Sequence, residues 1–476
     1  MKRFVLTVLL LGSLAGAVGA DTYIYTGASG ANDGASWTDA LEAMPTADGW
    51  TAVSSRGDVV WFADDTHDLS PTWNGWYQMT TPDNSGSTSW TWRKATAANH
   101  GTETGWSDSM GDGQTVIKGF ILVGMQDNDR ADYFHIDGQV GYGDGSAEAY
   151  GFVFQPPTML VDSVALLKAR YSYRTHWTIE HCEFDAGDEG EAQVEKNKIA
   201  PLSASGSDFL IENCYMHDSA WVCLEIELSD SYLQDCYIEN RRGGYTTGTT
   251  SYIHGSLMTV NPKTATANFH VRRNVWTNCN GTAYIETTNI NDGPHGQVYI
   301  YNNLFIQSDL TRNFTNNMIG ATSFAITENY LIAGNTFWMH ASHTEDSAGI
   351  GFYGSVASDE IKNNLFLNCD MSAVAHSAGE THLYNAYWNC TNAPSGSNQQ
   401  TLGSNPCTGA PSDLALDFAT DNGLTLGAPY TTDYAGNTRG ADSVWDRGAY
   451  EYVVIVSPPE TAEYVLFWDG GIYFHE

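Results

Sequence analysis

Side chains that can transfer protons cluster in the middle of the chain. His217 and Glu239 each stand four residues after a recurring sequence position, Arg241 and Arg242 follow Glu239 closely, and Lys198 lies in a polar stretch before them. Histidine, glutamate and lysine act as general acids or bases, and arginine can neutralise developing negative charge. We therefore predict catalytic roles for His217, Glu239, Arg242 and Lys198, and contact with the bound molecule for Arg241. The alternative is that these residues form only structural charge pairs.

Three carboxylates in the same region could hold a cation. Glu225 and Glu227 alternate with apolar residues in VCLEIEL (222–228), so both should point to the outer side of a strand, and Asp218 shortly precedes them. Carboxylate oxygens are preferred ligands of Ca²⁺. We therefore predict Asp218, Glu225 and Glu227 as metal ligands, with Ca²⁺ as the candidate cofactor. The alternative is a solvated acidic face without a ligand.

Tryptophan is concentrated in residues 61–106, among glycine, serine, threonine and aspartate. Aromatic rings in polar loops can stack on sugar rings, because they offer an apolar face with a polar rim. We predict that Trp73 and Trp76 contact a bound sugar. The alternative is that these tryptophans cover wide coils at the start of the fold.

The elements that must position these residues follow from a repeat. The pattern apolar-x-x-Asn-x-aromatic occurs in LIENCY, VRRNVW, IYNNLF, IAGNTF and IKNNLF, and more loosely in IEHCEF, YLQDCY and HLYNAY. The fourth residue of each copy falls at positions 182, 213, 235, 274, 303, 335, 364 and 385. Spacings of 21 to 39 residues indicate a solenoid.

The segments between the copies predict an all-β solenoid. Short stretches with period-2 alternation, such as TAYIE (282–286) and GIGFY (349–353), are separated by turn residues, and helical periodicity is almost absent. Strands that stack without helices form a parallel β-helix. Asparagines at equivalent positions of successive coils would then hydrogen-bond to one another in a buried ladder.

Two end motifs add to this pattern. YIYTGASGANDGASWTDAL (23–41) and RGDVVWFADDTHD (56–68) stand at the beginning, and GNTRGADSVWDRGAYEY (436–452) stands near the end. With the ladder, they make the chain resemble the right-handed parallel β-helix, pectate-lyase-like proteins secreted by bacteria. The resemblance covers roughly residues 21–452 and is specific for the fold, whereas this fold hosts many activities.

Enzymes of two kinds that cleave polysaccharides, lyases and glycoside hydrolases, occur among the proteins that the chain resembles, and the predicted residues fit either chemistry. In a lyase, His217, Lys198 or Arg242 would remove the proton next to a uronate carboxylate, and the bound cation or an arginine would neutralise that carboxylate. In a hydrolase, two carboxylates among Glu225, Glu227 and Glu239 would flank the scissile bond. No sequence signature of either enzyme class assigns a catalytic role to a particular residue.

The ends of the chain predict its organisation. Residues 1–20 read as a secretory signal peptide, with Lys2 and Arg3 before an apolar run. Residues 21–165 should form an N-terminal cap and the first coils, with a capping helix over Ala35 to Met44. Residues 166–452 should form the regular β-helix. Residues 453–476 form an apolar tail that reads as a hairpin around residues 469–471 and could serve for self-association.

Charge and cysteine content bound the partners. The formal net charge of −35 should repel nucleic acid, and no later stretch is long and apolar enough to span a membrane. Cys214 and Cys236 should lie in adjacent coils, as a disulfide or as stacked thiols, and Cys390 and Cys407 are the better candidates for a local disulfide.

These observations lead to one expected function with two alternatives. We expect a secreted β-helix protein that binds and cleaves an extracellular polysaccharide. The alternatives are a non-catalytic surface, adhesive or structural solenoid and a protein like a phage tailspike.

Overall fold

The structure is a computed structural model of the chain. It describes residues 21–46, 49–69, 76–82, 87–123, 131–141, 150–157, 164–187, 199–219, 222–239, 256–260, 268–279, 283–287, 297–308, 318–321, 329–342, 350–352, 359–370, 380–453, 466–468 and 471–473. The predicted signal peptide lies outside the described residues. Within them, no helix has the length and apolar character needed to cross a membrane.

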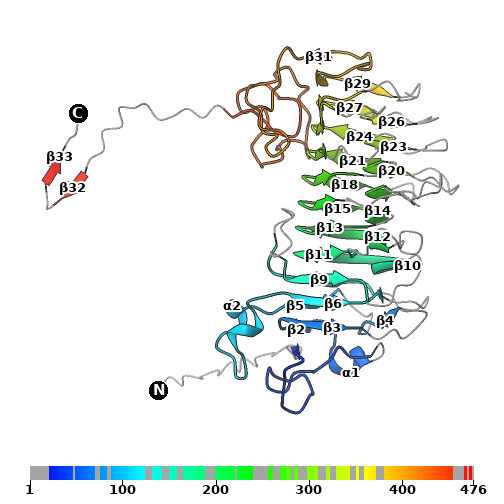
Figure 1. The fold of residues 1–476 in the computed structure, drawn as a ribbon, viewed down its shortest axis with the longest axis vertical. Helices are drawn as coiled ribbons and strands as arrows, with labels where there is room; N and C mark the ends of the chain where they lie inside the picture. The colour runs from blue at the N-terminus through cyan, green and yellow to red at the C-terminus, as the bar shows by residue number, and fades with distance from the viewer. Residues whose placement is uncertain are drawn as a thin grey trace, which may run out of the picture.

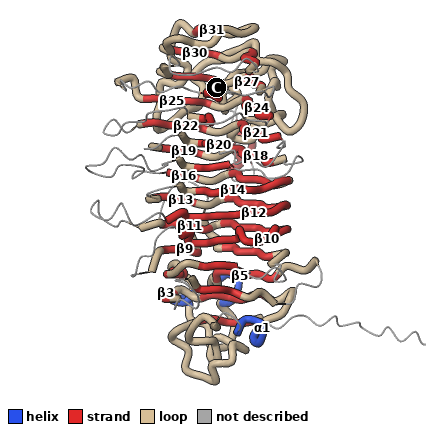
Figure 2. The backbone as a smooth tube through the Cα atoms, turned by 90° about the vertical axis from the view of Figure 1, so that its right-hand side faces the viewer, coloured by secondary structure: helices blue, strands red, loops and turns tan. Residues whose placement is uncertain are grey.

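Parallel strands wind into a tall stack of coils (Figures 1 and 2). In the described residues they form a 19-stranded sheet, called sheet A, and a 12-stranded sheet, called sheet B. Sheet A consists of two columns of strands and sheet B of a third, and the chain visits columns 1, 2 and 3 in turn. This confirms the predicted parallel β-helix.

The strands of each column are as follows. Column 1 contains β4 (Tyr77–Met79), β7 (Ile121–Val123), the first parts of β10 (Val164–Glu180) and β12 (Ile199–Glu212), β14 (Leu224–Ser229), β17 (Met258–Val260), β20 (Ile285–Thr287), β23 (Ile319–Ala321) and β26 (Ile350–Phe352). Column 2 contains β1 (Thr22–Ile24), β2 (Val59–Phe62), β5 (Trp90–Lys94), β8 (Phe134–Asp137), the last parts of β10 and β12, β15 (Ser231–Gln234), β18 (Phe269–Arg272), β21 (Gln297–Tyr301), β24 (Asn329–Ala333), β27 (Glu360–Lys362) and β29 (Thr381–Leu383). Column 3 contains β3 (Asp65–Asp68), β6 (Thr115–Lys118), β9 (Phe152–Gln155), β11 (Cys182–Asp185), β13 (Tyr215–His217), β16 (Tyr237–Glu239), β19 (Val275–Thr277), β22 (Leu304–Gln307), β25 (Thr336–Met339), β28 (Leu365–Leu367), β30 (Ala386–Trp388) and β31 (Gln400–Thr401).

The predicted asparagine ladder lies at the turn between columns 2 and 3. Its members are the buried residues Asn274, Asn303, Asn335, Asn364 and Asn385. Each Nδ2 donates to Oδ1 of the next asparagine at 3.0 to 3.1 Å, and the same oxygen accepts the backbone N–H of the residue below. Every buried amide in this file therefore has partners, which removes the cost of burying it.

Cysteines extend the ladder toward the N-terminus. Strand pairing aligns Cys182, Cys214 and Cys236 with Asn274, and the backbone N–H of Cys236 donates to Oδ1 of Asn274 at 3.0 Å. The prediction that position 213 and position 235 belong to the ladder is therefore wrong by one residue.

The error has a physical cause. Asn213 and Asp235 have φ angles of 51° and 53°, and Asn302 and Asn363 have the same left-handed conformation one residue before the ladder. Asparagine and aspartate tolerate this conformation better than other non-glycine residues. Two adjacent positions of each coil thus favour asparagine, and only the second is the ladder.

The first asparagine of each NNLF sequence binds the C-terminal segment, residues 405–453. Nδ2 of Asn302 donates to the carbonyl of Thr432 (2.6 Å), and Nδ2 of Asn363 donates to the carbonyl of Leu424 (2.7 Å). Gly334 occupies the equivalent position between them, with a φ of 62°. A Cβ there would lie 3.0 Å from Oδ1 of Asn302 and 3.1 Å from Nη2 of Arg439. The close approach of this segment therefore requires glycine.

The N-terminal end is closed differently from the prediction. Ala35 to Met44 form turns rather than a helix, and Leu41 exchanges backbone hydrogen bonds with Tyr23 and Tyr25. This segment thus pairs with the edge of β1, which satisfies backbone groups that a helix would leave exposed. Only short helices occur in the described residues: α1 (Trp50–Val53), α2 (Ala97–His100) and the 3₁₀ turn Asp108–Met110.

The structure bears on the expected disulfide and on the expected C-terminal hairpin. All eight cysteines are free, so the expected Cys390–Cys407 disulfide is not formed. Sγ of Cys390 instead accepts the backbone N–H of Cys369 (3.4 Å), because these residues lie in adjacent coils. The predicted hairpin is confirmed: β32 (Leu466–Trp468) pairs antiparallel with β33 (Gly471–Tyr473).

Candidate functional site

The structure distributes the predicted site residues over two sheets. His217 and Glu239 end strands of sheet B, and Asp218 follows His217 directly. Glu225 and Glu227 lie in β14 of sheet A. Lys198, Arg241, Arg242 and Trp73 lie outside the described residues, so their roles stay predictions.

His217 is held between carboxylates. Its Nδ1 lies 2.8 Å from Oδ2 of Asp218, and its Nε2 lies 3.1 Å from Oε1 of Glu183 in the adjacent coil. Burial alone would lower the pKa of His217, but the hydrogen bonds to these two carboxylates raise it from its usual value to about 9. The ring also stacks on Tyr215, with centroids 4.1 Å apart.

Glu239 belongs to the same surface of sheet B. Its Oε2 accepts a hydrogen bond from the hydroxyl of Tyr215 (3.3 Å), and its Oε1 accepts one from Nδ2 of Asn278 (3.1 Å). Tyr215 therefore links His217 to Glu239. The structure thus brings together three of the predicted residues, His217, Asp218 and Glu239.

The glutamates of β14 point outward, as the alternation predicts. The neighbouring apolar residues of VCLEIEL are buried, and Glu225 aligns with Glu286 two coils later. However, Glu227 is 3% exposed and Glu286 is fully buried, so this is not a solvated acidic face. The hydroxyl of Ser203 donates to Oε2 of Glu225 at 3.0 Å.

The predicted Ca²⁺ ligands are not gathered at one point. Among the described residues, two groups place at least three ligand atoms within 4.8 Å of one another: His135, Asp137 and Glu180, and Asp185, His217 and Asp218. Neither group contains Glu225 or Glu227. Both groups contain an imidazole, whereas Ca²⁺ prefers oxygen ligands alone. The described residues therefore do not fit the expected Ca²⁺ site.

Trp76 lies in the core rather than on an open surface. Its side chain is 6% exposed and packs with the main hydrophobic cluster. The ammonium group of Lys168 lies 5.2 Å from the ring centroid. This burial favours the alternative that the tryptophans cover the first coils.

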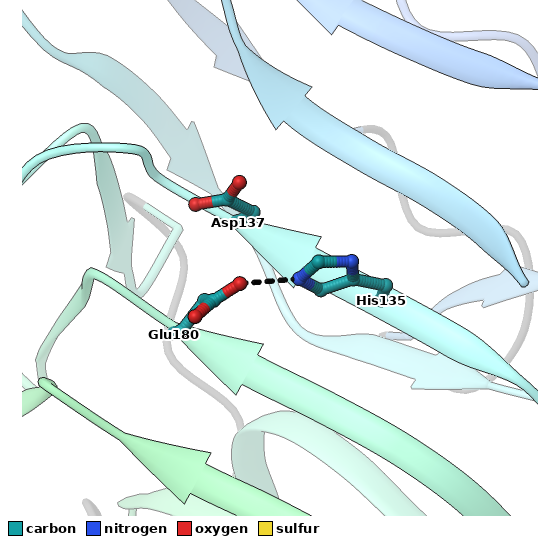
Figure 3. A group of neighbouring side chains, drawn as sticks. All are labelled: His135, Asp137 and Glu180. Carbon is teal, nitrogen blue, oxygen red and sulfur yellow. Dashed lines mark hydrogen bonds and ion pairs between the residues drawn. The ribbon is translucent and has the colours of Figure 1, made fainter.

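Sequence reasoning missed a charged group on the outer face of column 2. Asp137 ends β8 and lies directly opposite Glu180 at the end of β10, so two carboxylates meet on adjacent coils. His135 lies in β8 two residues before Asp137, on the same face, and its Nε2 is 2.6 Å from Oε1 of Glu180 (Figure 3). One carboxylate oxygen of Asp137 lies within 4.8 Å of one carboxylate oxygen of Glu180.

Three groups hold Asp137 as a carboxylate. Nε of Arg93 donates to Oδ2 (3.0 Å), and Oδ1 interacts with Nδ1 of His181 (3.1 Å) and the backbone N–H of Gln139 (2.7 Å). Burial would raise the pKa of Asp137, but these hydrogen bonds and the charge of Arg93 lower it below its usual value. Conversely, burial would lower the pKa of His181, but its hydrogen bond to Asp137 raises it.

This group is partly accessible, although Asp137 itself is buried. The side chains of Arg93, His135 and Glu180 are 31%, 21% and 19% exposed. Two neighbouring carboxylates in different surroundings can divide the roles of nucleophile and proton donor. The sequence hides the pair, because β8 precedes the first copy of the repeat and its register with β10 cannot be read without that marker.

The fold has counterparts among solved structures. A crystal structure of pectate lyase Pel9A matches with a TM-score of 0.51 and 11% identity, over 90% of this chain and 96% of that chain. A PL6 alginate lyase in complex with a trisaccharide matches with a TM-score of 0.43 and 10% identity, over 74% and 80% of the two chains. The catalytic unit of an α-1,3-glucanase from Streptomyces thermodiastaticus matches with a TM-score of 0.34 and 13% identity, over 76% and 65%.

The remaining comparisons found no match. No family model matches the sequence, and no curated protein matches it. At such low identities the structural matches show the fold alone, because a fold of this kind hosts unrelated activities. The chain therefore has the parallel β-helix fold of the pectate-lyase-like proteins.

Proposed function

We propose that this protein is a secreted glycoside hydrolase that cleaves an extracellular polysaccharide, with Asp137 and Glu180 as its acid pair. The observation that supports this function best is the in-register placement of the two carboxylates on the outer face of sheet A, with oxygens within 4.8 Å. Carboxyl groups about 5 Å apart are typical of retaining glycosidases, whereas inverting enzymes need a wider gap for a water molecule.

The surroundings of the two carboxylates suggest their roles. Asp137 is kept ionised by Arg93, His181 and a backbone N–H, which suits a nucleophile. Its oxygen would form an ester with the anomeric carbon as the bond to the leaving oxygen breaks. Glu180, beside His135, would donate its proton to that oxygen. Glu180 would then accept a proton from water, and the resulting attack would release Asp137 with retained configuration.

The test is hydrolysis of a broad panel of neutral and acidic polysaccharides, followed by a reducing-sugar assay. We expect the wild type to cleave a member of the panel. Glu180→Gln and Asp137→Asn should each lower kcat by about 10³-fold, because each removes a group that takes part in the transition state. Glu360→Gln is the matched control, since Glu360 lies in the same column but pairs with Lys362 (2.7 Å). Equal losses in all three variants would contradict the assignment.

A uronate lyase remains the second candidate. It would use predicted residues that lie outside the described residues: Lys198 or Arg242 as base, with Arg241 and Trp73 near the substrate. His217 is a poor base in this arrangement, because carboxylates occupy both of its ring nitrogens. Ultraviolet absorbance of unsaturated products, measured with and without Ca²⁺, would favour the lyase. No cleavage in either assay would favour a non-catalytic surface or adhesive role.

A further inference from the structure

We propose that Asp185, His217 and Asp218 form a zinc-type metal site on sheet B, with Glu183 as the residue that orients the histidine. This site is separate from the Asp137–Glu180 pair of sheet A and does not depend on the proposed hydrolase. It differs from the expected Ca²⁺ site, because its ligand set includes an imidazole nitrogen and neither Glu225 nor Glu227.

The three ligand atoms converge at the end of two adjacent strands. Asp185 ends β11, His217 ends β13 in register with it, and Asp218 follows His217. Nδ1 of His217 lies 2.8 Å from Oδ2 of Asp218 and 4.0 Å from Oδ1 of Asp185. One ligand atom from each of the three residues lies within 4.8 Å of the other two. Tetrahedral ligands at about 2.1 Å from Zn²⁺ are about 3.4 Å apart, so small side-chain rotations would complete the geometry.

Glu183 supplies the independent observation that points to a metal. It is 5% exposed, its Oε1 faces Nε2 of His217, and its Oε2 is buried without a hydrogen-bond partner. A carboxylate buried in this way favours a proton on Nε2, so that a bound metal would displace the proton of Nδ1 and occupy the side of the ring that faces Asp185 and Asp218. Histidines that bind metals are typically oriented by a carboxylate on the other ring nitrogen.

The other parts of the site are also fixed in place. Oδ2 of Asp185 accepts a hydrogen bond from Nε2 of Gln155 (3.0 Å), and Oδ1 accepts the backbone N–H of Gly187 (2.8 Å). The imidazole of His217 stacks on Tyr215. A site with one nitrogen and two carboxylate oxygens suits Zn²⁺ better than Ca²⁺, and three protein ligands leave a position open for water or substrate.

The test uses the full mature chain, stripped of metal with a chelator and dialysed. Isothermal titration with ZnCl₂ should show one equivalent bound per chain with micromolar or tighter affinity, and CaCl₂ should bind far more weakly. Asp218→Asn is the first variant, because Asp218 has a φ of 57°, a conformation that asparagine tolerates. It should weaken Zn²⁺ binding at least 100-fold, as should His217→Gln.

Two further variants separate a metal site from a structural cluster. Glu183→Gln should weaken Zn²⁺ binding 10- to 100-fold while the ligands stay in place. His135→Gln is the matched control in the other triad and should leave the stoichiometry and affinity unchanged. Absence of stoichiometric Zn²⁺ binding to the wild type, or binding that Asp218→Asn leaves unchanged, would overturn the proposal. Circular dichroism of the metal-free variants confirms that each is folded.

Discussion

At the scale of single residues, Asp137 and Glu180 show how surroundings divide the roles of equal groups. Like charges directly opposite each other on neighbouring strands are destabilising. Here Arg93 and His181 contact Asp137, while His135 contacts Glu180, and these contacts offset the repulsion. Two neighbouring carboxyl groups surrounded by three basic side chains stabilise the fold less than an apolar pair would. Charged groups arranged at such a cost are typical of functional sites.

Arg93 offers a prediction about the pH dependence of catalysis. Its charge helps to lower the pKa of Asp137, and Asp137 must be ionised to act as a nucleophile. Arg93→Leu should therefore raise that pKa and move the acidic limb of the kcat/KM profile to higher pH. A pH–rate profile of the variant checks this shift. An unchanged acidic limb would show that Asp137 is not the ionised partner.

His270 offers a prediction about stability. It lies between the rings of Tyr232 and Tyr299, with centroids 4.7 and 4.5 Å away. Burial, followed by the charge of Arg272, lowers the pKa of His270 from its usual value to about 4, although Asp230 opposes this shift. The unfolded chain therefore binds a proton that the folded chain does not between about pH 6.5 and pH 4.

The contribution of His270 to stability is complete above about pH 6.5 and is lost as the pH falls toward 4. His270→Phe keeps a stacked ring but cannot titrate. Thermal unfolding at pH 7 and pH 5 should thus show a smaller loss of Tm in the variant than in the wild type. Equal losses in both proteins would be inconsistent with a depressed pKa at this position.

At the scale of elements, the ladder determines how the coils are held. Oδ1 of Asn335 accepts a hydrogen bond from the backbone N–H of Asn303, and Nδ2 of Asn335 donates one to the carbonyl of Ile300 (2.9 Å). Asn335→Leu would leave the buried backbone N–H of Asn303 without its acceptor, at a cost of about 1–3 kcal/mol. Denaturant unfolding should show this loss. Asn268→Ala, at an exposed coil entry, is the control and should change stability by less than about 0.5 kcal/mol.

The sequence predicts the elements well where ladder and turn residues differ in type. The sequence places Asn274 and Asn335 correctly, because arginine and glycine precede them and the aromatic residue follows at a fixed distance. Cys214 and Cys236 were missed as ladder members, since a preceding asparagine or aspartate imitates the pattern. Residue type alone does not separate a left-handed turn from a ladder position.

The site could be predicted only in part for a related reason. His217, Asp218 and Glu239 were recognised from their spacing after the repeat, and they do lie on one surface. His135 and Asp137 stand before the first repeat copy, and their partner Glu180 comes from the next coil of column 2. Contacts between coils depend on register, and register depends on loop lengths that the sequence does not mark.

At the scale of the whole molecule, the C-terminal segment docks along the side of the solenoid near the end of the stack (Figure 1). Nη2 of the buried Arg439 donates to Oδ1 of Asn302 (2.9 Å) and to the carbonyls of Gly448 and Ala449, and Nη1 lies 3.6 Å from Glu451. This network joins the end motif GNTRGADSVWDRGAYEY (436–452) to the turns of the regular coils. The motif is therefore a docking element, which explains its position near the end of the repeat.

Arg439→Met should undock this segment. The substitution leaves Glu451 without its cationic partner and Asn302 without a donor, at a cost of about 3–5 kcal/mol. Limited proteolysis should then cut the variant within residues 405–453 under conditions in which the wild type resists. Identical digestion of the two proteins would show that Arg439 does not hold the segment.

The measurement that tests the proposed hydrolase most directly is the anomeric configuration of the first product, followed by proton NMR during digestion of the polysaccharide that the panel identifies. We predict a product with retained configuration in the wild type and product formation about 10³-fold slower with Glu180→Gln. An unsaturated or inverted product, or cleavage that Glu180→Gln leaves intact, would contradict the assignment of the Asp137–Glu180 pair.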